Sequence, residues 1–286
     1  MNNLCCIIIP IYKETLNEYE ITSLKQCCLI LIKYSIIFVT HKMLNCNIYK
    51  NICDNYKINY KFEYFDKKYF TDISCYNALL LSKIFYKRFI NYEYMLIYQL
   101  DAYVFRDELE YWCQKGYDYI GAPWLSLDNS RIMPVFNKSP VVGNGGFSLR
   151  KINKFIAMHS ISLNILSLIH LFQYNYNKIS LKSHNNIIYI IPRIIFRPFL
   201  NILKFLFFKY DESDNNEDVK WSCLFSKNGK VPSVSEAMKF SFESFPEYLY
   251  QLNNEELPFG CHDWYKYYNY LFYKKHIKHF VTENIR

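Results

Sequence analysis

The first 40 residues contain two uninterrupted apolar runs, separated by a segment whose apolar residues have helical spacing. The runs cover residues 4–11 (LCCIIIPI) and 35–40 (SIIFVT), and residues 15–33 place Leu24 and Leu31 on one side of a helix. Continuous apolar runs of this length are typical of strands buried on both faces of a parallel sheet. A strand, a helix and a second strand in this order predict a βαβ unit, and with it an α/β fold with a mainly parallel sheet.

Later segments extend the predicted sheet. Residues 94–101 are expected to form a buried strand after a helix at 73–90, and shorter strands are expected at 117–120 and 147–150. The first of these strands ends in Asp101. Ligands of open α/β sheets bind beyond the carboxyl ends of the strands. Asp101 is therefore a candidate ligand-binding residue, although a carboxylate at a strand end is also a common turn former.

The positive charge of the chain is confined to one segment. The chain has 286 residues and a formal net charge of +8, and residues 151–210 hold eight basic and no acidic side chains. The rest of the chain carries 26 basic and 26 acidic side chains and is neutral. This distribution argues against a nucleic-acid-binding protein with a generally basic surface. An apolar content of 51% with 21% charged residues also excludes a disordered chain.

The ten cysteines follow neither a metal-binding nor a disulfide pattern. Two pairs are adjacent, at 5–6 and 27–28, and no CxxC spacing occurs. We therefore predict reduced, mostly buried thiols in a cytoplasmic protein. No basic stretch precedes the short apolar run at the N-terminus, so we expect no secretory signal.

Glycine is scarce except at one place. Three of the seven glycines, Gly143, Gly145 and Gly146, lie within four residues and flank Asn144. Glycine permits unusual backbone dihedral angles and close approach of another group to the backbone. The cluster predicts either a tight turn before the strand at 147–150 or a loop that lines a ligand.

Two further clusters contain residues suited to acid–base or metal chemistry. Glu217 and Asp218 are adjacent and closely precede Trp221, which fits either a general base beside a stacked sugar ring or the first turn of a helix. His262 lies in a glycine-containing turn, directly before Asp263. Taken singly, each cluster also has an ordinary structural explanation.

Together and in this order, these segments resemble a bacterial family of uncharacterised glycosyltransferase-like domains with the GT-A fold. The matching segments are IPIY at 9–12, YQLDAYVF at 98–105, YDYIGAPW at 117–124, VGNGGFSLR at 142–150, NEDVKWS at 216–222 and PFGCHDW at 258–264. The resemblance implies a GT-A-like (Rossmann-like) α/β fold with a mixed, mainly parallel central sheet flanked by helices. It further implies a nucleotide-sugar-binding half at 1–150 and an acceptor-side part at 211–286. Residues 151–210 lie outside the match, and their basic, apolar composition predicts a helical insertion or a separate helical subdomain.

The resemblance implies a donor site and a metal site. The residues expected to bind the donor are Pro10, Tyr12, Glu14, Thr40, His41, Gln99, Asp101, Asn144, Gly145 and Gly146. Asp101 matches the first position of the Asp-x-Asp motif by which such enzymes bind Mn²⁺ or Mg²⁺. Tyr103 replaces the second Asp. The expected metal ligands are therefore Asp101 and His262, or the reaction proceeds without metal.

The resemblance also implies the reaction. Glu217 and Asp218 match the acidic pair near the acceptor hydroxyl, and Trp124, Trp221 and Trp264 are expected on the acceptor side. The implied enzyme is an inverting glycosyltransferase that moves a sugar from a nucleotide-sugar donor to a glycan or lipid-linked acceptor, in surface polysaccharide synthesis. The alternative is a non-catalytic carbohydrate-binding or scaffolding protein that keeps the fold. No nucleic-acid partner is expected.

Residues 187–208 contain 15 Ile, Leu or Phe residues, and this length could span a bilayer. Arg193 and Arg197 near its middle cost roughly 3 kcal/mol each on insertion, so we expect no membrane span. On a helix, Arg193, Arg197, Asn201 and Lys204 share one narrow face. This pattern predicts either a helix at an anionic membrane surface, with the protein peripheral on the inner face of the cytoplasmic membrane, or a helix packed on the domain.

Overall fold

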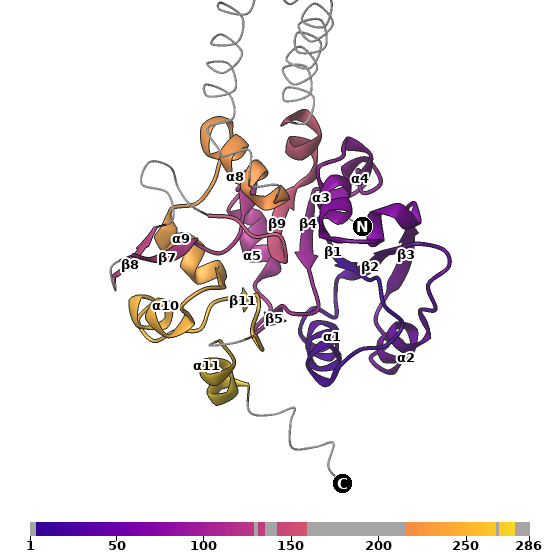
Figure 1. Cartoon of the computed structure of the whole chain (residues 1–286), viewed down its shortest axis with the longest axis horizontal. Helices are drawn as coiled ribbons and strands as arrows, with labels where there is room; N and C mark the ends of the chain where they lie inside the picture. Colours follow the sequence, from indigo (N-terminus) through magenta and orange to yellow (C-terminus); the bar gives the residue numbers. More distant parts are fainter. Residues whose placement is uncertain (1–3, 129–130, 135–141, 159–215, 267–268, 278–286) are drawn as a thin grey trace, which may run out of the picture.

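The centre of the protein is a six-stranded sheet with the order β3-β2-β1-β4-β9-β6 (Figure 1). The computed structural model describes residues 4–128, 131–134, 142–158, 216–266 and 269–277. The strands of the sheet are β1 (Cys5–Pro10), β2 (Ser35–Thr40), β3 (Tyr60–Tyr64), β4 (Tyr94–Tyr98), β6 (Tyr119–Ile120) and β9 (Phe147–Lys151). β3, β2, β1 and β4 are parallel, and β9 is antiparallel to both β4 and β6. The predicted mixed, mainly parallel sheet is confirmed.

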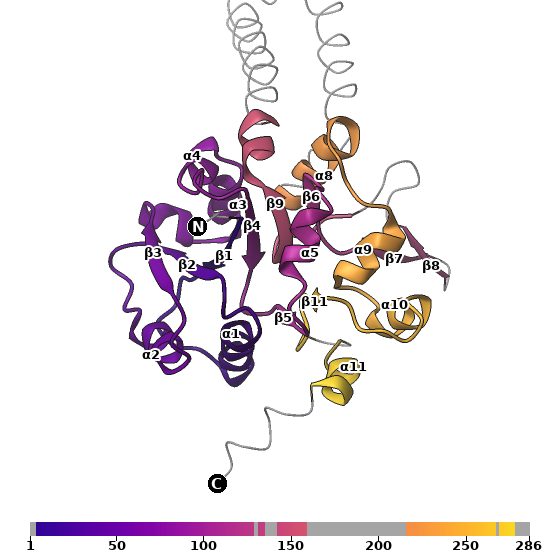
Figure 2. The ribbon, with the colours of Figure 1, turned by 180° about the vertical axis from the view of Figure 1, so that it is seen from behind.

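Helices cover both faces of this sheet (Figures 1 and 2). One face packs against α1 (Glu18–Ile30), α2 (Asn47–Asn55) and α5 (Leu109–Gln114). The other face packs against α3 (Ile73–Leu80), α4 (Lys83–Lys87) and α8 (Glu217–Asn228). The fold therefore has three layers, with the sheet in the middle.

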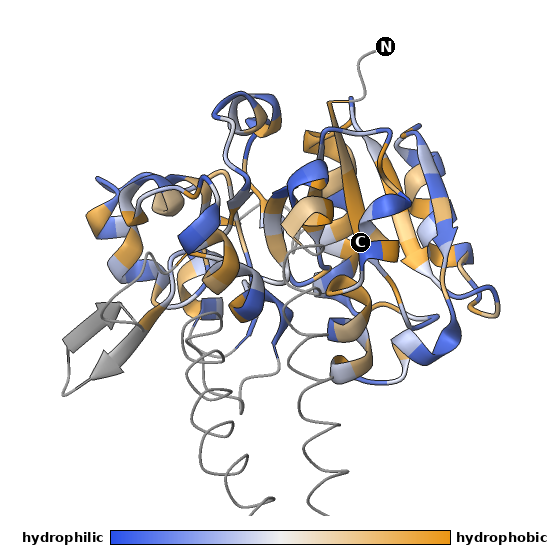
Figure 3. Cartoon of the chain, turned by 90° about the horizontal axis from the view of Figure 1, so that it is seen from above, coloured by the Kyte–Doolittle hydropathy of each residue, from blue (hydrophilic) through white to orange (hydrophobic). Residues whose placement is uncertain are grey.

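The alternation of side chains along the central strands produces these two cores. In β1, Ile7 and Ile9 join the core beneath α1 and α2, whereas Ile8 joins the core beneath α3 and α4. Each of these three side chains is at most 1% exposed, and full burial of such a side chain stabilises the fold by about 1.5–3 kcal/mol. Figure 3 shows the resulting hydrophobic strands at the centre of the molecule.

Polar side chains set the ends of the predicted helices. The helix expected at 15–33 begins only at Glu18, because Asn17 and Glu20 form a reciprocal capping box with each other's backbone N–H. The single helix expected at 73–90 is divided into α3 and α4. Ser82 causes this division, since its hydroxyl donates to the carbonyl of Leu79 in α3 and accepts the N–H of Phe85 in α4.

A second, smaller unit brings the C-terminal part of the chain to the sheet. It contains α9 (Val234–Phe240), β10 (Ser241–Phe242), α10 (Pro246–Leu252), β11 (Gly260–Cys261) and α11 (Asn269–His276). β11 pairs antiparallel with β5 (Tyr103–Val104), which follows β4 closely in the chain. This pairing places residues 260–266 beside the end of β4. The remaining elements are the 3₁₀ turn η1 (Lys67–Phe70) and the hairpin β7 (Leu125–Asp128) and β8 (Arg131–Pro134).

Most of the predicted basic insertion lies outside the described residues. Residues 152–158 are helical, and the prediction of a helix at 187–208 falls on residues that the structure does not describe. Among the described residues, no helix is both long enough and apolar enough to cross a membrane. All ten cysteines are described, all are free thiols, and eight of them are buried, as predicted.

Candidate functional site

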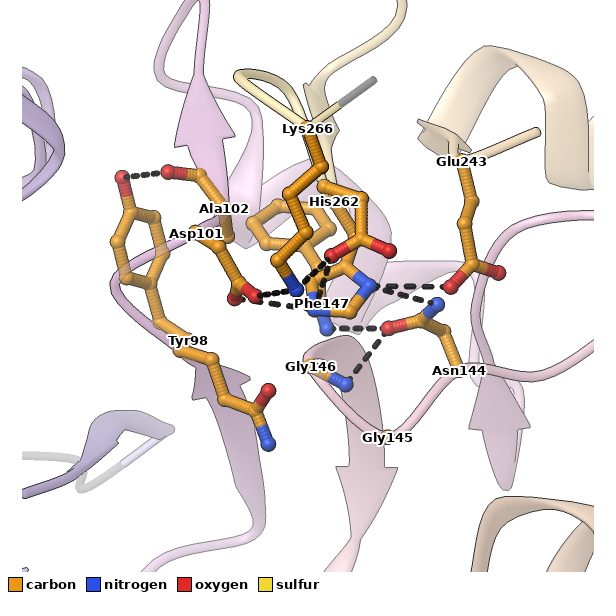
Figure 4. Close-up of polar contacts among 12 residues, drawn as sticks. Tyr98, Asp101, Ala102, Asn144, Gly145, Gly146, Phe147, Glu243, His262 and Lys266 are labelled. Atoms are coloured by element: carbon orange, nitrogen blue, oxygen red, sulfur yellow. Dashed lines mark hydrogen bonds and ion pairs between the residues drawn. The ribbon is translucent and has the colours of Figure 1, made fainter. Parts of the chain in front are cut away.

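The candidate site lies where the end of β4 meets the start of β9. Because β9 is antiparallel to β4, the loop before β9 lies beside the residues that follow β4. The backbone N–H of Gln99 donates to the carbonyl of Gly146 at 2.8 Å and joins the two segments. Asp101 and the glycine loop (residues 143–146) therefore share the carboxyl edge of the parallel strands, where open α/β sheets bind ligands. Figure 4 shows the side chains that gather there.

Asn144 gives the glycine loop its shape. Its Oδ1 accepts the backbone N–H groups of Gly146 at 2.6 Å and Phe147 at 2.7 Å. A Cβ atom on Gly146 would lie only 1.9 Å from Nε2 of His262. Gly146 is therefore required for close approach of an imidazole to the backbone, and its φ is not in the left-handed region. The loop therefore contacts a polar side chain of another segment, beyond forming a turn before β9.

Glu217 forms a buried ion pair with Arg150 of β9. The guanidinium donates to both carboxylate oxygens, from Nη2 at 2.8 Å and from Nη1 at 3.1 Å, and the side chains are only 2% and 0% exposed. Nη1 also donates to the hydroxyl of Tyr86 at 3.0 Å. Burial opposes the charge of Arg150, but the neighbouring Glu217 outweighs it and raises the pKa of the guanidinium well above its usual value. Glu217 and Arg150, called the buried pair below, thus provide each other with both a countercharge and hydrogen bonds.

Asp218 is the next residue in the first turn of α8, and its surroundings differ. Its Oδ2 accepts the N–H of Gly145 at 3.0 Å, and its Oδ1 accepts the N–H of Val219 at 2.8 Å. Its side chain pairs with no cation among the ion pairs of the described residues, and it is partly exposed. Burial, followed by the charge of Glu243, raises the pKa of Asp218 above its usual value. This carboxylate is suited to accept a proton.

His262 is held between two carboxylates. Its Nδ1 lies 3.0 Å from Glu243 Oε1, and its Nε2 lies 3.1 Å from Asp101 Oδ1 (Figure 4). Burial opposes charge on the ring, but Asp101 and Glu243 raise the pKa of His262 well above its usual value. Nε2 and Asp101 Oδ1 are not aligned for a hydrogen bond, and both remain without a hydrogen-bond partner within the described part of the chain.

Lys266 completes this group of charges. Its ammonium lies 2.6 Å from Asp101 Oδ2 and 2.5 Å from Asp263 Oδ1. Burial opposes the charge of Asp101, but His262 and then Lys266 outweigh it and lower the pKa of this carboxyl group. We call Asp101, His262, Asp263 and Lys266 the cation cluster.

The side chains of Asp101, His262 and Asp263 fit a divalent cation. One ligand atom of each lies within 4.8 Å of the others. Two neighbouring ligands at about 2.1 Å in an octahedral site are roughly 3.0 Å apart, close to the 3.1 Å between the two unpartnered atoms of Asp101 and His262. The two carboxylates suit Mg²⁺ or Mn²⁺. The Nδ1–H of His262 would donate a hydrogen bond to Glu243 and leave Nε2 free to ligate.

The departure from Asp-x-Asp has a structural reason. Tyr103 is only 5% exposed and packs against Trp264 in the core of the smaller unit. A carboxylate at this position would be buried among apolar side chains without a partner, which is costly. Asp263, from a segment 160 residues later in the chain, lies close enough to Asp101 to offer a second carboxylate to a cation instead.

The remaining predicted donor residues follow the ends of β1 and β2, at the same edge of the sheet. Tyr12 is 64% exposed, and Glu14 accepts the N–H of Asn45 at 3.3 Å. Pro10 ends β1 and is partly buried. Thr40 Oγ1 and His41 Nδ1 are buried without a hydrogen-bond partner among the described residues. Their role in donor binding stays a prediction.

The predicted acceptor-side tryptophans lie in different environments. Trp221 is 1% exposed and donates its indole N–H to the carbonyl of Leu80, and Trp264 is 4% exposed. A buried indole presents no free ring face to a sugar, so this burial argues against both contacts. Trp124 is partly buried and remains a candidate.

Four residues of the candidate site were not among the predicted site residues: Arg150, Glu243, Asp263 and Lys266. Glu243 follows a two-residue strand and stands apart from every motif. Arg150, Asp263 and Lys266 lie in or directly after the segments that carried the resemblance, and their charge was the available signal.

Three solved structures are similar to this one at low identity. WbbM, a bifunctional glycosyltransferase in its apo form, has a TM-score of 0.49 and 12% identity over 92% of this chain and 46% of its own. The apo form of the glycosyltransferase GlyE of Streptococcus pneumoniae TIGR4 has a TM-score of 0.47 and 12% identity over 91% of this chain and 54% of its own. Core-mannan synthase A (CmsA/Ktr4) of Aspergillus fumigatus, in its Mn/GDP form, has a TM-score of 0.41 and 14% identity over 56% of this chain and 63% of its own.

The chain thus spans about half the length of the WbbM and GlyE chains. At these identities, no activity is carried over from these proteins. No curated protein sequence matches the chain. Residues 59–262 match the family described as "Protein of unknown function (DUF5672)", and because this match covers more than half of the sequence, the chain belongs to that family.

Proposed function

We propose that the protein is a glycosyltransferase that moves a sugar from a nucleotide-sugar donor to an acceptor hydroxyl. The observation that carries the proposal is the arrangement of Asp218 and the cation cluster around one glycine loop. Asp218 contacts Gly145, and His262 lies against Gly146. A proton acceptor and a site for a phosphate-binding cation are therefore separated by the width of this loop. Inverting glycosyl transfer from a diphosphate can use both groups, one to deprotonate the acceptor and one to stabilise the leaving diphosphate.

In the proposed mechanism, Asp218 accepts the proton of the acceptor hydroxyl. The hydroxyl oxygen forms a bond to the anomeric carbon as the bond from that carbon to the phosphate oxygen breaks, and the nucleoside diphosphate leaves. Attack from the face opposite the leaving group inverts the anomeric centre. The raised pKa of Asp218 suits this role, because a general base is most effective when its pKa approaches the working pH. Burial raises the pKa of Glu217 as well, to about 7, but both oxygens of Glu217 accept hydrogen bonds from Arg150.

Glu217 has a positioning role in this proposal. Its two hydrogen bonds to Arg150 fix the first turn of α8, and thereby the backbone that carries Asp218. The sequence alone left Glu217 and Asp218 as equal candidates for the base. The buried pair with Arg150 favours Asp218.

The diphosphate is proposed to lie at the cation cluster. Asp101, His262 and Asp263 would hold Mn²⁺ or Mg²⁺, which would neutralise charge on the departing diphosphate when bound. Lys266 holds Asp101 and Asp263 in their present positions. Thr40 and His41 lie at the end of β2 on the same edge, and their unpartnered polar atoms favour a donor group there.

We further propose a glycan or lipid-linked acceptor, a role in bacterial surface polysaccharide synthesis, and a cytoplasmic location with peripheral membrane contact through residues 187–208. The basic and apolar composition of that segment supports the membrane contact.

The test is a screen of nucleotide sugars for nucleoside diphosphate release, with and without Mn²⁺ and with candidate acceptors. Asp218→Asn should lower the rate about 100- to 10,000-fold while the protein stays folded. Asp54→Asn, at an exposed position near the end of α2, is the control and should keep the rate. Full activity of Asp218→Asn would refute its role as the base.

A second function, carbohydrate binding without transfer, is favoured by one observation. Lys266 occupies the space between two carboxylates of the cation cluster, as in a site that needs no metal. Binding of a nucleotide sugar without release of diphosphate from any donor, measured by calorimetry, would support this function over transfer.

A further inference from the structure

The ammonium of Lys266 lies where a divalent cation would bind. It contacts Asp101 Oδ2 at 2.6 Å and Asp263 Oδ1 at 2.5 Å, and these two residues are among the three that fit a cation. The ammonium supplies one positive charge and donates a charge-assisted hydrogen bond to each carboxylate. The third residue of that set, His262, still has an unpartnered Nε2.

The same carboxylates cannot serve both cations in this arrangement. A metal ion bound to Asp101 and Asp263 would lie about 2.1 Å from their oxygens, in the space that the ammonium fills at 2.5 and 2.6 Å. The two positive charges would also repel each other at this distance. The side chain of Lys266 is 41% exposed, so solvent lies beside it and the ammonium has a path outward.

The backbone of the turn directs both side chains to this place. Asp263 has a φ of 56°, in the left-handed region that residues other than glycine rarely adopt. The N–H of Lys266 donates to the carbonyl of Asp263 at 3.1 Å and closes the turn. The ion pairs of Lys266 with Asp263 and Asp101, which this turn makes possible, offset the backbone strain at Asp263.

We propose that Lys266 is an internal competitor of the divalent cation, which must displace its ammonium from Asp101 and Asp263 to bind. Lys266 thereby sets the metal affinity of the site and keeps Asp101 paired when metal is absent. This inference concerns the cluster that the proposed function uses, but it rests on the contacts of Lys266 alone. Its test needs no sugar donor, so it can fail or succeed independently of glycosyl transfer.

The experiment is a Mn²⁺ titration of the full chain followed by electron paramagnetic resonance of the free ion. Lys266→Met should bind Mn²⁺ about 10- to 100-fold more tightly than the wild type, because the two ion pairs that the metal no longer has to break are made by a part-exposed ammonium and are weakened by solvent. Lys266→Arg keeps a cation and should bind as weakly as the wild type. Lys275→Met, an exposed lysine of α11, is the matched control and should leave the affinity unchanged.

The added affinity must come from the cluster. Combining Lys266→Met with Asp101→Asn should remove the gain, and a gain that survives would place the ion elsewhere and overturn the proposal. Unchanged or weaker binding by a folded Lys266→Met would overturn it as well.

A measurement on the wild type guards against a misfolded variant. Lysine acetylation by acetic anhydride, quantified by peptide mass spectrometry, should increase at Lys266 when Mn²⁺ is added, because displacement frees the ammonium. Lys275 should be labelled equally in both conditions. Constant or reduced labelling of Lys266 at saturating Mn²⁺ would contradict displacement.

Discussion

The buried pair and the cation cluster lie on either side of one glycine loop, and both bring opposite charges together. In the buried pair, Arg150 and Glu217 are 0% and 2% exposed, and each carboxylate oxygen accepts a hydrogen bond from the guanidinium. In the cation cluster, His262 Nε2 and Asp101 Oδ1 lack a hydrogen-bond partner among the described residues, and Lys266 is 41% exposed.

This difference separates two uses of buried charge. A pair whose hydrogen bonds are complete has nothing left to offer a ligand, and its loss exposes an uncompensated charge. In a cluster with unpartnered buried atoms, the lost hydration of those atoms is not compensated while no ligand is bound. A ligand that enters from the exposed side can contact these atoms and remove that cost. We therefore expect substitutions in the buried pair to change stability, and substitutions around the cation cluster to change binding.

The largest expected effect is on the buried pair. Arg150→Met should lower the free energy of unfolding by about 3–5 kcal/mol, because it leaves the buried carboxylate of Glu217 without its partner. Denaturant unfolding followed by circular dichroism measures this loss. Arg150→Met combined with Glu217→Met removes both charges and should recover part of the stability. If the single substitution lowers the free energy of unfolding by less than about 1 kcal/mol, the buried pair stabilises the fold no more than an exposed surface ion pair does.

An intermediate effect is expected at the glycine loop. Gly146→Ala should weaken Mn²⁺ binding about 10- to 100-fold, because its Cβ would lie 1.9 Å from His262 Nε2 and force the imidazole away. Gly145→Ala is the matched control, since its Cβ would face Glu217 at 3.2 Å instead. Calorimetric titration of both variants measures the contrast. Equal Mn²⁺ affinities for the two variants would mean that the position of His262 does not govern the cluster.

The smallest expected effect is a shift in the pH dependence of the proposed transfer. A general base acts only when deprotonated, so kcat/KM should fall as pH decreases through the pKa of Asp218. Burial and Glu243 raise the pKa of Asp218, so this acidic limb should lie above the usual aspartate pKa of about 3.9. A pH profile of the wild type checks its position. The same limb in the residual activity of Asp218→Asn would assign it to another group.

The strands of the buried sheet were predictable because their apolar runs are continuous. β1 and β2 fall within the predicted ranges. β3 (YKFEY) was missed because its apolar residues alternate with charged ones and form no continuous run. β3 is the edge strand of the sheet and is not completely buried. The break between α3 and α4 was missed although Ser82 carried the signal, since serine is a favoured N-cap residue.

The candidate site was predictable in part, through residues that occur in motifs. Asp101, Asn144, Gly146 and His262 do meet in space. Glu243 could not be found, because an isolated acid acquires its place only when β10 pairs with β11. The same limit applied to the choice between Glu217 and Asp218. Their different surroundings come from Arg150, which lies 67 positions before Glu217.

The antiparallel pairing of β5 with β11 also has a consequence for the order of folding. Asp101 and Lys266 are 165 positions apart in sequence, and Asn144 and His262 are 118 apart. Contacts of such separation require closure of long loops and form late relative to local structure. We therefore expect the cation cluster to form only after the local strands and helices that carry its residues. A ligand of this cluster would bind only the folded chain and would therefore shift the folding equilibrium toward the native state.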